Sequence, residues 1–214
     1  IAGQILNAGF ELLVHDASRE AAQPLLDGGA EWAGSPREVA QRSEIVCTCL
    51  PGPPEMESVA LGPDGIAEGL AEGSLYIDHT TNSPALVRRV HGTLAEKGVA
   101  MLDAPVSGGM EGAQTRDLTV LVGGDADSFQ RAKPVLDAMA KTVMHVGDIG
   151  AGSICKVTHN SASFARSLAV MECLTLGVKA GVEPAVLLEV FQKCALGTNF
   201  DLHVRMPSTI FSGD

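Results

Sequence analysis

The segment LYIDHTTNSPALVRRVHGTLAEKGVAMLDAPVSGG, residues 75–109, decides the fold. Its apolar start predicts a strand over 75–78, and the following pattern predicts a helix over 84–97 that begins at a proline and ends before Gly98. A second strand is predicted over 99–103. Strand, helix and strand in this order form the unit that joins two parallel strands of one sheet.

The same alternation extends through most of the chain. Further strands are expected over 11–15, 45–50, 118–122 and 143–146, and further helices over 2–8, 18–26, 36–42 and 125–140. This order predicts an α/β fold, with a Rossmann-type, doubly wound, mostly parallel sheet and helices on both faces. No first strand and no G-x-G-x-x-G loop open the sequence, so we expect the stretch to begin inside this domain.

The pattern changes after Gly152, where the strand signal ends. Apolar residues at alternating spacings of three and four predict one long helix over 153–180, followed by a helix from Pro184 to Lys193. We therefore expect an incomplete dinucleotide-binding domain over residues 1–147 and an incomplete, all-helical domain over 148–214 that starts with a long interdomain helix. The apolar stripe of this helix suggests a lid or a dimer interface, so a homodimer or homotetramer is expected.

Composition excludes several kinds of partner. The 214 residues carry a formal net charge of −11, which argues against nucleic acid and against anionic membranes. No apolar run reaches the roughly 18 residues of a membrane-spanning helix. The five cysteines include no C-x-x-C pair, which favours a reducing compartment, and we expect a cytoplasmic location. We assign no metal site.

In such sheets ligands bind beyond the carboxyl ends of the strands. The loop after the strand over 11–15 carries Asp16. A carboxylate there suits the ribose hydroxyls of NAD, and it also suits an ordinary turn. Ser107, Gly108 and Gly109 follow another strand. Their hydroxyl and N–H groups could hold an anion, although a plain tight loop explains them as well.

Lys156 and Asn160 are four residues apart in the predicted long helix, so they share one face. An ammonium and an amide presented together can hold a carboxylate and a reacting hydroxyl. The alternative is a solvated lysine with an incidental polar neighbour.

Four motifs together give the sequence a resemblance to a known family. They are Asp103-Ala-Pro-Val-Ser-Gly-Gly109 with Gly112-Ala113 and Leu118–Gly124, Gly147-x-x-Gly-Ala-Gly152 with Lys156 and Asn160, Leu50-Pro51, and Asp78-x-Thr-Thr81 with Pro84. Together they resemble the β-hydroxyacid dehydrogenase family, which includes the 3-hydroxyisobutyrate dehydrogenases and the tartronate semialdehyde reductases. The resemblance spans essentially the whole chain.

This resemblance implies a hydride transfer between NAD, or less favourably NADP, and a small β-hydroxyacid or its semialdehyde. It implies that Lys156 is the general acid–base residue. The substrate carboxylate would be held by Ser107, Gly108, Gly109 and Asn160, and the cofactor site would be lined by Asp16, Leu50, Pro51, Glu55 and Thr81.

The sequence also departs from the family pattern. The glycine-rich phosphate loop is absent, and the sequence stops where the family continues, so activity of this stretch by itself stays open. Glu55, Arg116 and His159 stand where relatives often carry a neutral residue, a glycine and an asparagine.

Three alternative functions remain. Imine reductases share the fold, but they often replace the residue at Lys156. Decarboxylating phosphogluconate dehydrogenases have a much larger helical domain. A non-catalytic dinucleotide-binding or oligomerisation module would not need Lys156, Asn160 and Ser107 together.

Overall fold

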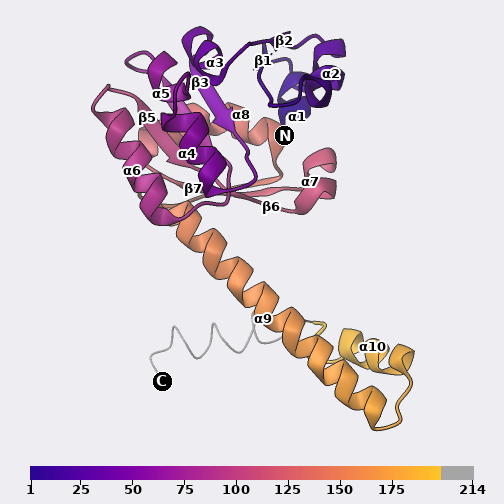
Figure 1. Ribbon diagram of the computed structural model, residues 1–214. Coiled ribbons are helices and arrows are strands. Elements are labelled where there is room, and N and C mark those ends of the chain that lie inside the picture. The colour runs from indigo at the N-terminus through magenta and orange to yellow at the C-terminus, as the bar shows by residue number, and fades with distance from the viewer. Residues whose placement is uncertain (199–214) are drawn as a thin grey trace. The chain divides into compact units, whose positions relative to one another are not determined.

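The computed structural model describes residues 1–198 (Figure 1). The strands are β1 (Leu13–Val14), β2 (Glu31–Trp32), β3 (Ile45–Thr48), β4 (Leu75–Asp78), β5 (Ala100–Asp103), β6 (Val106–Ser107), β7 (Thr119–Gly123) and β8 (Thr142–Gly147). The helices are α1 (Ala2–Asn7), α2 (Arg19–Asp27), α3 (Pro36–Arg42), α4 (Pro53–Leu61), α5 (Ile66–Gly69), α6 (Pro84–Ala95), α7 (Gly109–Thr115), α8 (Ala126–Met139), α9 (Ala151–Lys179) and α10 (Pro184–Lys193). Every element expected from the sequence has a counterpart, whereas β2, β6, α4, α5 and α7 were not expected.

The strands form two sheets. The larger has the order β3-β4-β5-β7-β6, with β8 also paired to β7, and the smaller pairs β1 with β2. Neighbouring strands run parallel throughout, except that β7 is antiparallel to β5 and β6. The mostly parallel α/β fold is therefore confirmed. The split into two sheets was not expected, and it arises because no strand within residues 1–198 pairs with both β1 and β3.

Helices cover both faces of the larger sheet, as the alternation predicted (Figure 1). Successive side chains of a strand point to opposite faces. Ile77 of β4 accordingly packs in a cluster with Leu136 of α8, and the preceding Tyr76 packs in a second cluster with Met56 of α4 and Val90 of α6. The core is thus two apolar layers on either side of one sheet.

Two helix starts that the sequence predicted are capped by serine. The Ser35 hydroxyl accepts a hydrogen bond from the Glu38 N–H at the start of α3, and Ser83 accepts one from Leu86 at the start of α6. In both helices a proline occupies the first turn, where its missing N–H costs nothing.

The chain divides into two compact units, Ile1–His159 and a second unit that begins at Asn160. The first two turns of α9 belong to the first unit. They contain all the buried residues of this helix, which are Gly152, Ser153 and Lys156. The domain boundary at 147/148 remains a prediction, and the last part of the predicted helical domain, residues 199–214, lies outside the described residues.

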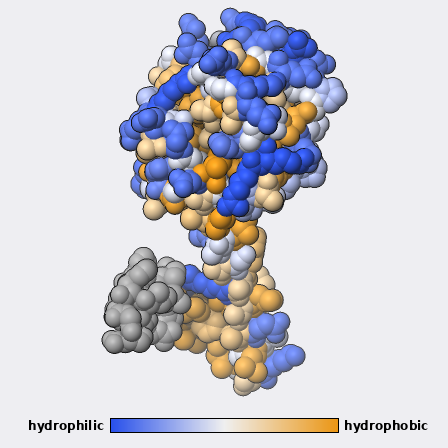
Figure 2. All heavy atoms as spheres, turned by 90° about the vertical axis from the view of Figure 1, so that its left-hand side faces the viewer, coloured by the Kyte–Doolittle hydropathy of each residue, from blue (hydrophilic) through white to orange (hydrophobic). Residues whose placement is uncertain are grey.

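The second unit exposes many large apolar side chains along α9 and α10, and Figure 2 shows apolar atoms gathered on the face that it presents. The most exposed are Phe164, Leu168, Met171 and Leu176. At Gly177 the backbone of α9 approaches Leu187 of α10 so closely that a Cβ would lie 2.7 Å from that side chain. Among the described helices, none is both long and apolar enough to cross a membrane.

Candidate active site

The carboxyl ends of β3 and β4 meet around a buried carboxylate, that of Asp78. It accepts hydrogen bonds from the Thr48 hydroxyl (2.9 Å), the Thr80 N–H (3.1 Å) and the Asn82 amide group (2.6 Å). Because the Thr48 hydroxyl donates to Asp78, the Tyr76 hydroxyl, 2.7 Å away, donates to Thr48. Burial, together with the Asp78 charge, raises the pKa of Tyr76 well above its usual value. The buried charge is therefore satisfied by fixed donors.

The same network joins two loops that were predicted to contact the cofactor. The Leu50 N–H donates to the Thr80 hydroxyl at 3.0 Å, which connects the loop after β3 to the loop after β4. Leu50 and Pro51 are thereby placed beside the loop that carries Thr81. Glu55 lies in the first turn of α4, next along the chain from this loop, and is exposed.

Asp16 follows β1, in the smaller sheet. It is exposed, and one of its carboxylate oxygens accepts a hydrogen bond from the Ser18 N–H at 2.8 Å. This contact is the ordinary turn that the sequence also allowed. The second oxygen can still accept a hydrogen bond, so the turn and the proposed ribose contact are compatible.

A second buried carboxylate, Asp103 at the end of β5, lies where α9 begins. Its two oxygens accept hydrogen bonds from the N–H groups of Gly150 (2.7 Å) and Ser153 (2.6 Å). Burial raises the pKa of Asp103, and the two N–H donors oppose this rise. Asp103 therefore acts as a helix cap supplied by a distant strand.

Lys156 lies one helical turn beyond Ser153 and is buried, with 8% of its surface exposed. The alternative of a solvated lysine is therefore wrong. Within residues 1–198 its ammonium group forms no hydrogen bond or ion pair. Burial lowers its pKa, which is the direction that a general base near neutral pH requires.

The predicted carboxylate-binding loop runs from β6 into α7. Ser107 is half-buried and pairs with Thr119 of β7. Gly108 and Gly109 have φ angles of 135° and 65°, and a Cβ on Gly108 would lie 2.9 Å from the Asp117 carbonyl oxygen. This backbone requires glycine at position 108 and favours it at position 109. Asn160 lies in the second unit, so its proximity to this loop remains a prediction.

Sequence reasoning quoted Asp78 and Asp103 within motifs but gave neither a role. Their position as the last residue of a buried strand is the signal that could have identified them. It does not reveal their partners, because the donors to Asp103 come from 47 and 50 residues later in the chain.

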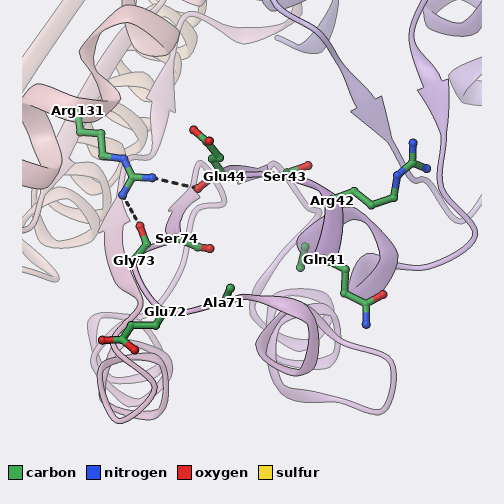
Figure 3. A pocket seen from close by; sticks show the side chains of 10 residues that line it. Gln41, Arg42, Ser43, Glu44, Ala71, Glu72, Gly73, Ser74 and Arg131 are labelled. Carbon is green, nitrogen blue, oxygen red and sulfur yellow. Dashed lines mark hydrogen bonds between the residues drawn. The ribbon is translucent and has the colours of Figure 1, made fainter.

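A hollow of about 540 Å³ lies at the opposite, amino ends of β3 and β4 (Figure 3). Arg131 spans its wall by donating to the carbonyl oxygens of Gly73 (2.5 Å) and Glu44 (3.4 Å). No predicted site residue lines it. Within the described residues no cluster of His, Cys, Asp and Glu side chains could hold a metal ion.

Comparison with known proteins agrees with this geometry. Residues 1–147 match the NAD binding domain of 6-phosphogluconate dehydrogenase. The chain is 39% identical to the 3-hydroxyisobutyrate dehydrogenase and 37% identical to the NAD-dependent L-serine dehydrogenase of Pseudomonas aeruginosa. Each match covers 97% of this chain and 69% of the relative.

Solved structures show the same similarity. The 3-hydroxyisobutyrate dehydrogenase of Mycobacterium tuberculosis, solved with L-serine, superposes with a TM-score of 0.84 at 29% identity, over 96% of this chain and 69% of that protein. The imine reductase of Streptomyces aurantiacus, at 20% identity and a TM-score of 0.81 over 100% of this chain and 74% of its own, shares the fold alone. These similarities support NAD as the cofactor, and the chain belongs to the β-hydroxyacid dehydrogenase family typified by 3-hydroxyisobutyrate dehydrogenase.

Proposed function

We propose that the protein oxidises a small β-hydroxyacid with NAD, or reduces the corresponding semialdehyde, and that Lys156 is its general acid–base residue. The observation that carries this proposal is the burial of Lys156 one turn from the helix start that Asp103 caps, at the carboxyl end of β5. A lysine in this position has no structural partner within residues 1–198, so its burial requires another explanation.

The residues at the sheet edge fit a dinucleotide. Asp16 offers an exposed carboxylate oxygen for ribose hydroxyls, and the Leu50–Thr80 hydrogen bond holds Leu50, Pro51 and Thr81 at one rim. Glu55 is the remaining residue that we assign to this rim. When bound, NAD supplies the hydride acceptor, and the chain's residues position the substrate against it.

In the oxidation direction, Lys156 Nζ accepts the proton of the substrate hydroxyl, and in reduction it returns that proton to the carbonyl oxygen. A lowered pKa makes both transfers feasible near neutral pH. Asn160 would orient the hydroxyl, while Ser107 and the N–H groups of Gly108 and Gly109 would hold the carboxylate. The names of the relatives support this substrate class, because 3-hydroxyisobutyrate and L-serine are both β-hydroxyacids.

The test is Lys156→Ala, assayed with 3-hydroxyisobutyrate and L-serine in the full-length protein. The variant should lose about a hundredfold or more in kcat and retain its affinity for NAD. Lys141→Ala is the matched control, because Lys141 is an exposed lysine paired with Asp117, and its kcat should not change. A fall of less than about tenfold in Lys156→Ala would contradict the assignment. Binding of NAD without turnover in the unsubstituted protein would favour a non-catalytic module instead.

We also propose that the protein is a homo-oligomer, a dimer or a tetramer, in which a second copy covers the exposed apolar side chains of α9 and α10. Leu168→Glu should then lower the mass measured by light scattering, whereas Met110→Glu, at an exposed apolar residue of α7, should not. The cytoplasmic location stays a prediction, supported by the five cysteines, which are all free thiols.

A further inference from the structure

A carboxylate from a strand distant in the sequence binds the start of α9 to the sheet. Asp103 is 1% exposed, and each of its carboxylate oxygens accepts one N–H, from Gly150 directly before this helix and from Ser153 in its first turn. Two of the four N–H groups that a helix start leaves without an intrahelical partner are thereby satisfied. The negative charge also lies at the positive end of the helix dipole.

Glycines allow this close approach. A Cβ on Gly152 would lie 2.3 Å from the Leu121 carbonyl oxygen and 2.5 Å from that of Asp103. A Cβ on Gly123 would lie 2.3 Å from the Asp103 carboxylate. Any side chain at either position would therefore push the helix start away from β5 and β7.

The buried face of α9 is short. Its buried residues, Gly152, Ser153 and Lys156, lie on one side of the first two turns, since Lys156 follows Ser153 by three positions and Gly152 by four. Lys156 is thus the last residue on the face that Asp103 holds. A helix rises 1.5 Å per residue, so the Cα of Lys156 lies about 4.5 Å along the axis from that of Ser153.

We propose that Asp103 is a positioning residue for Lys156: its carboxylate fixes the first turn of α9 against β5 and β7 and so keeps the lysine side chain largely buried at the carboxyl edge of the sheet. This inference rests on the proposed role of Lys156 and adds the residue that sets its environment. Asp103 does not act on the substrate itself.

The proposal predicts the sign of a pKa change. If Asp103 acted on Lys156 only through its negative charge, removing that charge would lower the lysine pKa further. If it acts by positioning, its loss loosens the helix start, more of the Lys156 side chain is exposed to water, and the pKa of its ammonium group rises. Burial is what lowers the pKa of Lys156 in the intact protein, so the second sign is expected. Arg88 of α6 also reaches this turn, since a Cβ on Gly150 would lie 3.3 Å from its guanidinium, and it is retained in every variant.

The experiment compares Asp103→Asn with the unsubstituted full-length protein. Asparagine has the same size, but its side chain carries one acceptor oxygen and one donor NH₂ group. It can accept one of the two backbone N–H groups, and its NH₂ group then faces the other N–H, which is also a donor. We expect the Lys156 pKa, measured by NMR on ¹³C-methylated lysines and assigned with Lys156→Arg, to rise by about half a unit or more. The Gly150 and Ser153 amides should exchange hydrogen at least about tenfold faster.

The matched control is Asp125→Ala. Asp125 caps α8 by accepting the Ser128 N–H at 2.9 Å on the exposed surface, so this variant loses a helix cap and a carboxylate and should leave the Lys156 pKa unchanged. Gly152→Ala should also push the start of α9 away from the sheet, and it leaves the Asp103 carboxylate intact. This variant should therefore raise the Lys156 pKa as well.

An unchanged or lowered Lys156 pKa in Asp103→Asn overturns the proposal. If this variant does not fold, an unchanged pKa in Gly152→Ala overturns it, and a rise supports it. A further measurement needs no variant: the Gly150 and Ser153 amides should exchange more slowly than those of Ala185 and Val186, which lie in the first turn of α10 without a side-chain cap. Equal rates contradict the proposal. None of these measurements uses turnover, so they test only the positioning role of Asp103. The acid–base role of Lys156 is tested separately, and activity of the Lys156→Ala variant would refute it.

Discussion

Asp78 and Asp103 are register partners on the neighbouring parallel strands β4 and β5, and both carboxylates are buried. Side chains paired in this way lie on the same face of the sheet, so two like charges stand side by side where the strands end. Each accepts hydrogen bonds from a separate set of donors. For Asp78 these are a hydroxyl group at the end of β3 and the amide and N–H groups of the loop after β4, and for Asp103 they are N–H groups at the start of α9. The edge at which we place the chemistry is thus built on two independently anchored carboxylates.

Asp78→Asn should destabilise the protein by about 2 kcal/mol, because the new amide group would face the amide donor of Asn82, which now donates to Asp78 at 2.6 Å. Urea unfolding measures the change. The control is Asp137→Asn, at an exposed carboxylate paired with Lys133, where the change should stay below about 0.5 kcal/mol. Equal stability of the two variants would mean that the buried network contributes nothing beyond a surface pair.

Gly69→Ala should cost about 2 kcal/mol or more, since its Cβ would lie 2.3 Å from the Arg37 carbonyl oxygen and 2.8 Å from the Ala40 Cβ, where α5 packs on α3. The matched substitution is Gly92→Ala in α6, whose Cβ would meet no atom within 4 Å. This control should stabilise the protein by about 0.5–1 kcal/mol through the lower entropy of the unfolded chain. Thermal unfolding of the pair tests both signs, and a tolerated Gly69→Ala would contradict the close packing of these helices.

Acidification should destabilise the protein through His79. Burial lowers the pKa of this histidine, and its Nδ1 donates to the Ala104 carbonyl oxygen at 2.8 Å, so the buried ring is neutral. Between the unfolded pKa of about 6.5 and the lower folded value, the unfolded chain binds more protons, and stability falls as the pH drops, by at most about 1.4 kcal/mol per pH unit.

Urea unfolding at pH 7.5 and pH 5.0 measures this loss. His79→Leu should reduce the loss, because it removes the titrating ring. The hydrogen bond to the Ala104 carbonyl oxygen that it also removes lowers stability equally at both pH values. His91→Leu, in α6, is the control and should keep the full pH dependence. A loss that is the same in His79→Leu would assign it to other groups.

Asp16→Ser should shift cofactor preference towards NADP. The exposed carboxylate would repel the additional phosphate of NADP and accept hydrogen bonds from the ribose of NAD, so its loss should raise the ratio of kcat/KM for NADP to that for NAD by about tenfold or more. Asp27→Asn, at an acidic residue bonded to Gln23 in α2, controls for the change in net charge. An unchanged ratio would remove Asp16 from the cofactor site.

The short strands β2 and β6 could not be predicted from the sequence, for a physical reason. The two-residue strands β2 and β6 have no periodicity of their own, and they exist because β1 and β7 offer paired backbone groups. Gly108 and Gly109 were recognised as a loop, but only the folded chain shows that their positive φ angles lead into α7.

The sequence by itself determined the alternation of strands and helices, the helix starts at Pro36 and Pro84, the family motifs, and the choice of Lys156 as the proposed acid–base residue. These features are local, because they depend on periodicity, on side chains within three or four positions, or on contiguous motifs. The tertiary structure alone decided that Lys156 is buried and that Asp103 caps its helix. Both depend on N–H groups and carboxylates that lie about fifty residues apart in the chain and meet only when β5 and α9 pack together.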